Sequence, residues 1–125
     1  MTKDLRVAIV GAGLMGTDHI ARVTNRISGA VVAAVIEPDA ARAEAAVEKA
    51  PGARAFSRFE EALEAGVIDA AIIATPGRFH ESVLKPALQA KLPVLCEKPL
   101  TPDSESLEHI LELEQRLERP HIQVG

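Results

Sequence analysis

The sequence predicts an α/β protein with a doubly wound parallel sheet of about six strands and helices on both faces. Short apolar runs alternate with stretches of helical periodicity along the whole chain. The runs are apolar throughout rather than alternately polar, which is typical of parallel strands buried on both faces. Because crossovers between parallel strands are right-handed, the favoured strand order is 3-2-1-4-5-6.

Composition excludes several classes of protein. The 125 residues are 47% hydrophobic and 26% charged, a balance that excludes intrinsic disorder and fits one domain. No apolar stretch is long enough to span a bilayer, and a strand-like run from residue 5 leaves no room for a signal peptide. With one cysteine, the expected compartment is the reducing cytoplasm.

The distribution of charge argues against nucleic acid as a partner. Residues 1–100 hold 12 acidic and 12 basic side chains, so the net charge of −4 arises from residues 101–125. No basic stripe is present, and the aromatic residues are three Phe without Tyr or Trp. A nucleic-acid site needs a basic surface and usually aromatic stacking, so neither requirement is met.

Six apolar runs are the expected strands, and several end at residues that break a strand. The first run ends at Gly11, the second begins after Ser28-Gly29, and the fourth ends at Thr75-Pro76-Gly77. The expected strands cover residues 5–10, 31–36, 53–56, 69–74, 93–96 and 121–124.

The first two helices follow from periodicity and capping. A helix over about 13–27 places Leu14, Ile20 and Val23 along one inner side. Asp39 can cap an alanine-rich helix that runs to Pro51-Gly52.

The last three helices also have recognisable ends. Ser57-Arg58-Phe59-Glu60 is a capping box, and Gly66 closes the helix that it opens. A helix over about 78–91 contains Pro86, which should kink it or remove one backbone hydrogen bond. Thr101-Pro102 starts an acidic helix over 103–118 with a solvated outer face. Its expected inner stripe is Leu107, Ile110, Leu111 and Leu117.

A glycine-rich loop joins the first strand to the first helix. Gly11-Ala12-Gly13-Leu14-Met15-Gly16 is G-x-G-x-x-G in the context that binds dinucleotides. Gly11 permits the tight turn, Gly13 lets the backbone approach a pyrophosphate, and Gly16 lets the helix pack closely on the strand. The helix N-terminus then offers N–H groups to phosphates. The alternative is a glycine-rich turn without a ligand.

Two further sites are expected at the carboxyl edge of the sheet. Glu37 lies 21 residues after Gly16, where an acid receives the adenosine ribose hydroxyls and repels the 2′-phosphate of NADP. The alternative for Glu37 is a solvated acid at a strand end. Glu97-Lys98-Pro99 follows the fifth strand, so Lys98 can carry protons or bind an oxyanion; the alternative is a solvated loop lysine.

At this point the chain resembles the glucose-fructose oxidoreductase / inositol dehydrogenase / rhizopine-catabolism family. The resemblance covers essentially all of the chain. It rests on these segments: 11–16, 18–30, Thr75 with His80-Glu81-Ser82, Glu97-Lys98-Pro99-Leu100 and Gln123-Val124-Gly125. The chain departs from the family where Glu37-Pro38 replaces the Asp-Val that is frequent in the subgroup.

The resemblance implies NAD-dependent oxidation of an inositol or sugar hydroxyl to a ketone, with NADP a less favoured cofactor. It implies that Lys98 is the catalytic lysine, that Glu97 lies by the nicotinamide ribose, and that Thr75, Pro76 and His80 line the cofactor crevice. It also implies a homo-oligomer, a tetramer by resemblance, and a substrate domain beyond residue 125. The expected cofactor-binding residues are Gly11, Ala12, Gly13, Leu14, Met15, Gly16, Glu37, Thr75, Pro76, His80, Glu97 and Lys98.

Other polar residues have simpler interpretations. His80 falls in the first turn of a helix, as either a neutral histidine of the crevice or a surface histidine. His19 is expected to pack or to form an interface, and Cys96 is expected to be an inert buried thiol. The four histidines are scattered over different elements, so no metal site is predicted.

The rival to a dehydrogenase is a non-catalytic module that senses NAD(H) in the same crevice. A sensor needs the glycine loop and Glu37 but has no use for Lys98, so the Glu-Lys-Pro tripeptide favours an enzyme.

Overall fold

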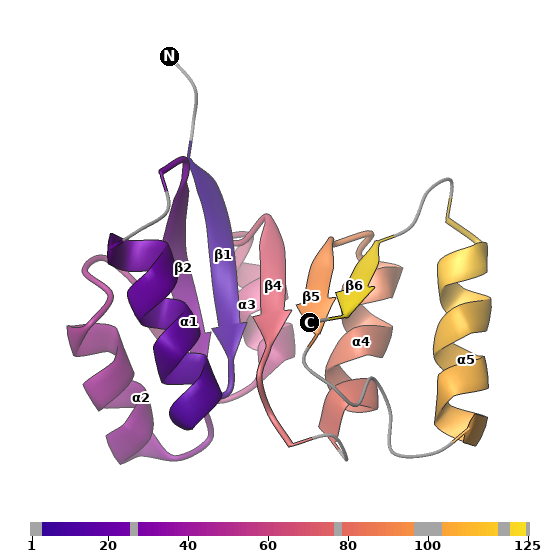
Figure 1. The fold of residues 1–125 in the computed structure, drawn as a ribbon, viewed down its shortest axis with the longest axis horizontal. Coiled ribbons are helices and arrows are strands. Elements are labelled where there is room, and N and C mark those ends of the chain that lie inside the picture. Colours follow the sequence, from indigo (N-terminus) through magenta and orange to yellow (C-terminus); the bar gives the residue numbers. More distant parts are fainter. Residues whose placement is uncertain (1–3, 26–27, 77–78, 97–103, 118–120, 125) are drawn as a thin grey trace.

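The computed structural model describes residues 4–25, 28–76, 79–96, 104–117 and 121–124. Their elements alternate between strand and helix along the chain (Figure 1). The strands are β1 (Leu5–Val10), β2 (Ala30–Ile36), β3 (Arg54–Phe56), β4 (Ala70–Ile73), β5 (Val94–Cys96) and β6 (Ile122–Val124). The helices are α1 (Leu14–Asn25), α2 (Ala40–Glu48), α3 (Phe59–Ala65), α4 (His80–Gln89) and α5 (Ser104–Gln115).

All strands are parallel and lie in the order β3-β2-β1-β4-β5-β6. This order and the fold class confirm the prediction from the sequence. In Figure 1, α1 lies in front of β1 and β2, whereas α3 lies behind the sheet. The chain order reverses between β1 and β4, and parallel sheets of this kind bind ligands at the carboxyl edge beside such a reversal.

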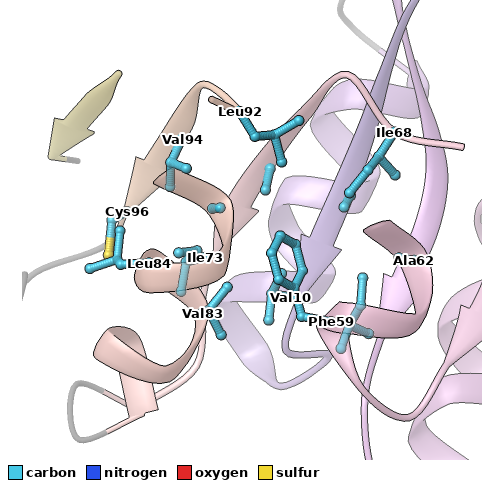
Figure 2. Packing of buried hydrophobic residues seen from close by; sticks show 14 of the residues in the cluster. Val10, Phe59, Ala62, Ile68, Ile73, Val83, Leu84, Leu92, Val94 and Cys96 are labelled. Carbon is cyan, nitrogen blue, oxygen red and sulfur yellow. The ribbon is translucent and has the colours of Figure 1, made fainter. Parts of the chain in front are cut away.

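Two apolar cores sandwich the sheet because neighbouring residues of each strand point to opposite faces. Val7 and Ile9 of β1 belong to the core that includes Ile20 and Val23 of α1. The other core contains Phe59 of α3, Leu84 of α4 and Ile110 of α5 among its buried residues. Figure 2 shows Phe59 and Val83 pointing toward Val10, with Cys96 beside Leu84.

The inner stripe predicted for α1 is wrong at Leu14. This side chain is 89% exposed, whereas Ile20 and Val23 are buried as expected. The helix begins at Leu14, so this residue lies above the carboxyl edge of β1 instead of against the sheet. Two large apolar side chains at the start of α1, Leu14 and Met15, therefore lie open to solvent.

The capping box at α3 is displaced by one residue from the prediction. Glu61 rather than Glu60 accepts the hydrogen bond from the backbone N–H of Arg58, at 2.9 Å, and it also accepts one from Ser57 Oγ. The helix ends at Gly66 as predicted, and this residue has the left-handed φ of 66°. Asp39 caps α2 as predicted, because its Oδ1 accepts from the N–H of Arg42.

The stripe predicted for α5 is wrong at Leu111. Ile110 is fully buried, but Leu111 is 41% exposed and Leu113 packs against the core in its place. Pro86 lies inside α4 without ending it. Among the helices that the structure describes, none has the length and apolar composition needed to cross a membrane.

Candidate functional site

The glycine loop connects β1 to α1 in a closely packed turn. Gly11 has a φ of 96°, and a Cβ built on it would meet Thr75 Cγ2 at 3.0 Å. A Cβ on Gly16 would lie 1.8 Å from the carbonyl oxygen of Gly11, a separation that real atoms do not reach. Gly11 is also tied to β2, because its N–H donates to the carbonyl oxygen of Ile36 at 2.8 Å. Both positions therefore require glycine for reasons of packing.

Gly13 differs from Gly11 and Gly16 because a side chain at this position would have room. A Cβ built there meets no atom within 4 Å, and the residue is exposed. The protein packing of this chain does not require glycine at position 13. A ligand that approaches the backbone at the start of α1 gives a reason for glycine, and the helix N-terminus offers it N–H groups. The residues present therefore fit the pyrophosphate of a dinucleotide.

Glu37, the residue after β2, is tied to the glycine loop. It is 8% exposed, and its Oε1 accepts a hydrogen bond from the N–H of Ala12 at 2.9 Å. Its Oε2 accepts one from the N–H of Asp39 at 3.0 Å. The interpretation of Glu37 as a solvated strand-end acid is therefore wrong. Each carboxylate oxygen has a second lone pair, so the group retains acceptor capacity for ribose hydroxyls.

A cavity of about 260 Å³ opens where several strands end. Val10 and Ile36 are the last residues of β1 and β2, and Ser57 and Thr75 follow β3 and β4 closely. The other lining residues come from the loops after these strands and from the starts of α3 and α4. The carboxyl ends of four strands thus converge on one hollow beside the glycine loop, which is where open α/β sheets bind ligands.

Thr75 and Pro76 lie at the mouth of this region. Pro76 is exposed and Thr75 is half-buried, and the Thr75 methyl group faces Gly11. The Thr75 hydroxyl is buried and has no hydrogen-bond partner among the described residues. An unsatisfied buried hydroxyl costs about 1–3 kcal/mol, so a group of this kind calls for a partner such as a water molecule or a ligand. This orphaned oxygen is a second observation that favours a ligand at the edge of the sheet.

His80 begins α4 and is fully buried, so its interpretation as a surface histidine is wrong. Its Nε2 lies 2.7 Å from the carbonyl oxygen of Thr75, and its Nδ1 lies 3.3 Å from Cys96 Sγ. Cys96 is buried as expected, although it contacts this ring rather than only apolar groups. His19 is 9% exposed, consistent with packing.

Glu97 and Lys98 lie outside the described residues. β5 ends at Cys96, so the sequence places both directly after the carboxyl end of that strand. Within the described part of the chain, no three His, Cys, Asp or Glu side chains gather so as to hold a metal ion. The sequence did not predict the hydrogen bonds that Glu37 accepts from the N–H groups of Ala12 and Asp39, because no sequence motif marks a backbone N–H as the partner of a carboxylate. It did not predict the contact between His80 and Cys96 either, because these residues belong to different elements of the chain.

The fold and this edge define a dinucleotide-binding domain. The chain belongs to the "Oxidoreductase family, NAD-binding Rossmann fold", whose profile matches residues 5–125. The resemblance on which the sequence analysis relied is thereby confirmed.

Known relatives include inositol dehydrogenases. The chain is 66% identical over 125 residues to inositol 2-dehydrogenase of Corynebacterium glutamicum strain R and 63% identical over 124 residues to that of Leifsonia xyli subsp. xyli. It covers 37% and 36% of those proteins, while they cover 100% and 99% of this chain. The chain thus spans little more than a third of their length.

A solved structure of similar fold is that of Lactobacillus casei myo-inositol dehydrogenase with NAD(H) and myo-inositol. The TM-score is 0.93 at 34% identity, covering 98% of this chain and 36% of that one. Scyllo-inositol dehydrogenase from the same organism, with NAD(H) and scyllo-inositol, gives a TM-score of 0.91 at 28% identity, covering 98% of this chain and 36% of that one.

Proposed function

We propose that this chain binds NAD for a full-length dehydrogenase that oxidises a secondary hydroxyl of myo-inositol or a related polyol to a ketone. The observation that carries this proposal is the glycine loop. Close packing leaves no room for a side chain at Gly11 or Gly16, whereas the space beside Gly13 is free for a ligand. The N–H of Ala12 in this loop donates a hydrogen bond to the buried carboxylate of Glu37. The 66% identity to an inositol 2-dehydrogenase supports the choice of substrate class.

The cofactor-binding residues divide into those that hold phosphate and those that hold adenosine. The backbone of Gly11–Gly16 and the first turn of α1 would hold the pyrophosphate, with exposed Leu14 and Met15 beside it. Glu37 would accept ribose hydroxyls, and its charge would disfavour a 2′-phosphate, so we expect NAD to bind better than NADP. Thr75 and Pro76 would line the crevice, and the Thr75 hydroxyl would gain a partner there.

The residues after β5 would carry the proton chemistry. Bound NAD supplies the hydride acceptor. The hydroxyl proton must leave while the carbon–hydrogen bond breaks, and we assign its acceptance or relay to the Lys98 amine. Glu97 would lie beside the nicotinamide ribose. Both assignments follow from position in the sequence, directly after the carboxyl end of β5.

We further propose that the rest of the full-length protein supplies a substrate domain. An apolar hollow of about 480 Å³ lies on the sheet face that carries Val7, Ile72 and Leu95, away from α3, α4 and α5. A second domain would cover this face, which lies toward the amino ends of the strands, and a separate part of that domain would bring substrate to Lys98 at the carboxyl edge. We also propose a homo-oligomer, a tetramer by family resemblance, working in the cytoplasm.

The test uses the full-length protein with myo-inositol, other inositols and simple sugars as candidate substrates. NADH formation, followed by its absorbance, is expected with an inositol and NAD, and more slowly with NADP. Glu64→Gln is the matched control for Glu37→Gln, because Glu64 is an exposed carboxylate of α3 that lies outside the cavity and takes no part in the loop. Binding of NAD without turnover of any polyol would favour the sensor instead.

A further inference from the structure

The buried ring of His80 joins the carboxyl ends of two neighbouring strands. Nε2 lies 2.7 Å from the carbonyl oxygen of Thr75, two residues after β4, and Nδ1 lies 3.3 Å from Sγ of Cys96, the last residue of β5. The pairing of these strands ends at Ile73 and Cys96. The ring therefore continues the connection between β4 and β5 past the end of their paired residues.

The chemistry of the two partners fixes the tautomer of the ring. A carbonyl oxygen only accepts hydrogen bonds, so Nε2 must carry the hydrogen that it shares with Thr75. In the neutral ring, Nδ1 is then an acceptor, and the thiol of Cys96 can donate to it. His80 thus receives a hydrogen bond from one strand end and donates one to the other, which defines both its orientation and the distance between them.

Each strand end leads to a different part of the proposed site. Thr75 packs its methyl group against Gly11, so the position of its backbone affects the glycine loop. Cys96 is followed in the sequence by Glu97 and Lys98. A shift of the ring would therefore move the cofactor-binding side relative to the residues that follow β5.

We propose that His80 is a positioning residue: its ring holds Thr75 and Cys96 at a fixed separation and so aligns the two sides of the crevice. This inference rests on the proposed dehydrogenase function. It assigns His80 no direct contact with substrate, because the ring is fully buried. Misplacement of reacting groups by about 1 Å can cost on the order of 100-fold in rate, so a small loss of alignment is measurable.

The tautomer can be tested without any enzymatic activity. Nitrogen-15 NMR of the imidazole in the 125-residue chain should show the hydrogen on Nε2 and none on Nδ1. Replacing Cys96 by Ala should shift the Nδ1 resonance and leave Nε2 nearly unchanged. A hydrogen on Nδ1 alone would overturn the assignment, whether or not the protein proves to be a dehydrogenase.

Kinetics of the full-length protein test the positioning role. Cys96→Ala should lower kcat several-fold with little change in the Kd of NAD, whereas Cys96→Ser should retain near-normal kcat because a hydroxyl can still donate to Nδ1. His80→Phe should lower kcat further and raise the Kd of NAD, since it also releases Thr75. The double variant with both Cys96→Ala and His80→Phe should have the same kcat as His80→Phe alone, because His80→Phe already removes the contact between the ring and Cys96.

Leu88→Ala is the matched control for loss of packing, since Leu88 is also buried on α4 but lies two turns further along. It should lower stability and leave kcat nearly unchanged at temperatures where the protein is folded. If Leu88→Ala lowers kcat as much as Cys96→Ala, or if the effects of His80→Phe and Cys96→Ala multiply, the positioning role is wrong. Should His80→Phe fail to fold, the two Cys96 variants still decide between these results. A wild-type protein without turnover would instead refute the proposed function.

Discussion

Substitutions at Gly16 and Gly13 should separate folding from ligand binding within one loop. A Cβ at Gly16 would lie 1.8 Å from the Gly11 carbonyl oxygen, so α1 or the loop must move by more than about 1 Å to accept alanine. Gly11 cannot yield easily, because its N–H is bonded to Ile36 and its neighbour Ala12 is bonded to Glu37. We expect Gly16→Ala to cost about 3 kcal/mol or more, the upper end for overpacking.

Gly13→Ala should do the opposite. Nothing lies within 4 Å of the built Cβ, and Gly13 is not among the residues with positive φ. Alanine there should therefore raise stability by about 0.4–1 kcal/mol through the unfolded state, while its methyl group obstructs the approach of a pyrophosphate and weakens NAD binding.

Thermal denaturation and NAD titration of the 125-residue chain check both halves of this prediction. For a chain of this size, about 1 kcal/mol corresponds to roughly 4 °C in Tm, so Gly16→Ala should melt more than about 10 °C below wild type. Gly13→Ala should melt at or slightly above wild type and bind NAD more weakly. An unchanged Tm for Gly16→Ala would refute the packing role of Gly16. An unchanged NAD affinity for Gly13→Ala would refute the role of Gly13 in ligand approach.

Three further predictions concern the cofactor and the catalyst. Glu37→Ser should narrow the preference for NAD over NADP, and it should also weaken NAD binding because Ala12 loses its acceptor; equal affinities of wild type for both cofactors would contradict this. The 125-residue chain should bind NAD but not oxidise inositol, and turnover by a verified pure chain would mean that the catalytic residues are misplaced. In the full-length protein, Lys98→Arg should lose nearly as much kcat as Lys98→Ala, since a guanidinium stays protonated; near-normal turnover would show that Lys98 supplies only charge.

Much of the fold could be predicted because its signals are local. Buried parallel strands are continuously apolar, so their positions, their order and the glycine loop between β1 and α1 follow from the sequence. The predictions of buried residues were wrong where the helical periodicity of the sequence does not match the position of the residue relative to the sheet. Leu14 fits the helical period but lies in the first turn, beyond the sheet that would bury it.

The candidate site was predictable in its residues more than in their contacts. Glu37 stands at the right distance from the glycine loop, yet nothing in the sequence indicates that its carboxylate binds the N–H groups of Ala12 and Asp39. His80 was expected at the crevice or on the surface. Its ring contacts Cys96, 16 residues further along, and the two come close only once β4 and β5 pair.

The most direct test of the central claim is calorimetric titration of the folded 125-residue chain with NAD and, separately, with NADP. We expect saturable binding of one NAD per chain and markedly weaker binding of NADP, because the buried Glu37 carboxylate would face the ribose position that carries the 2′-phosphate of NADP. A folded chain that binds neither dinucleotide would contradict it.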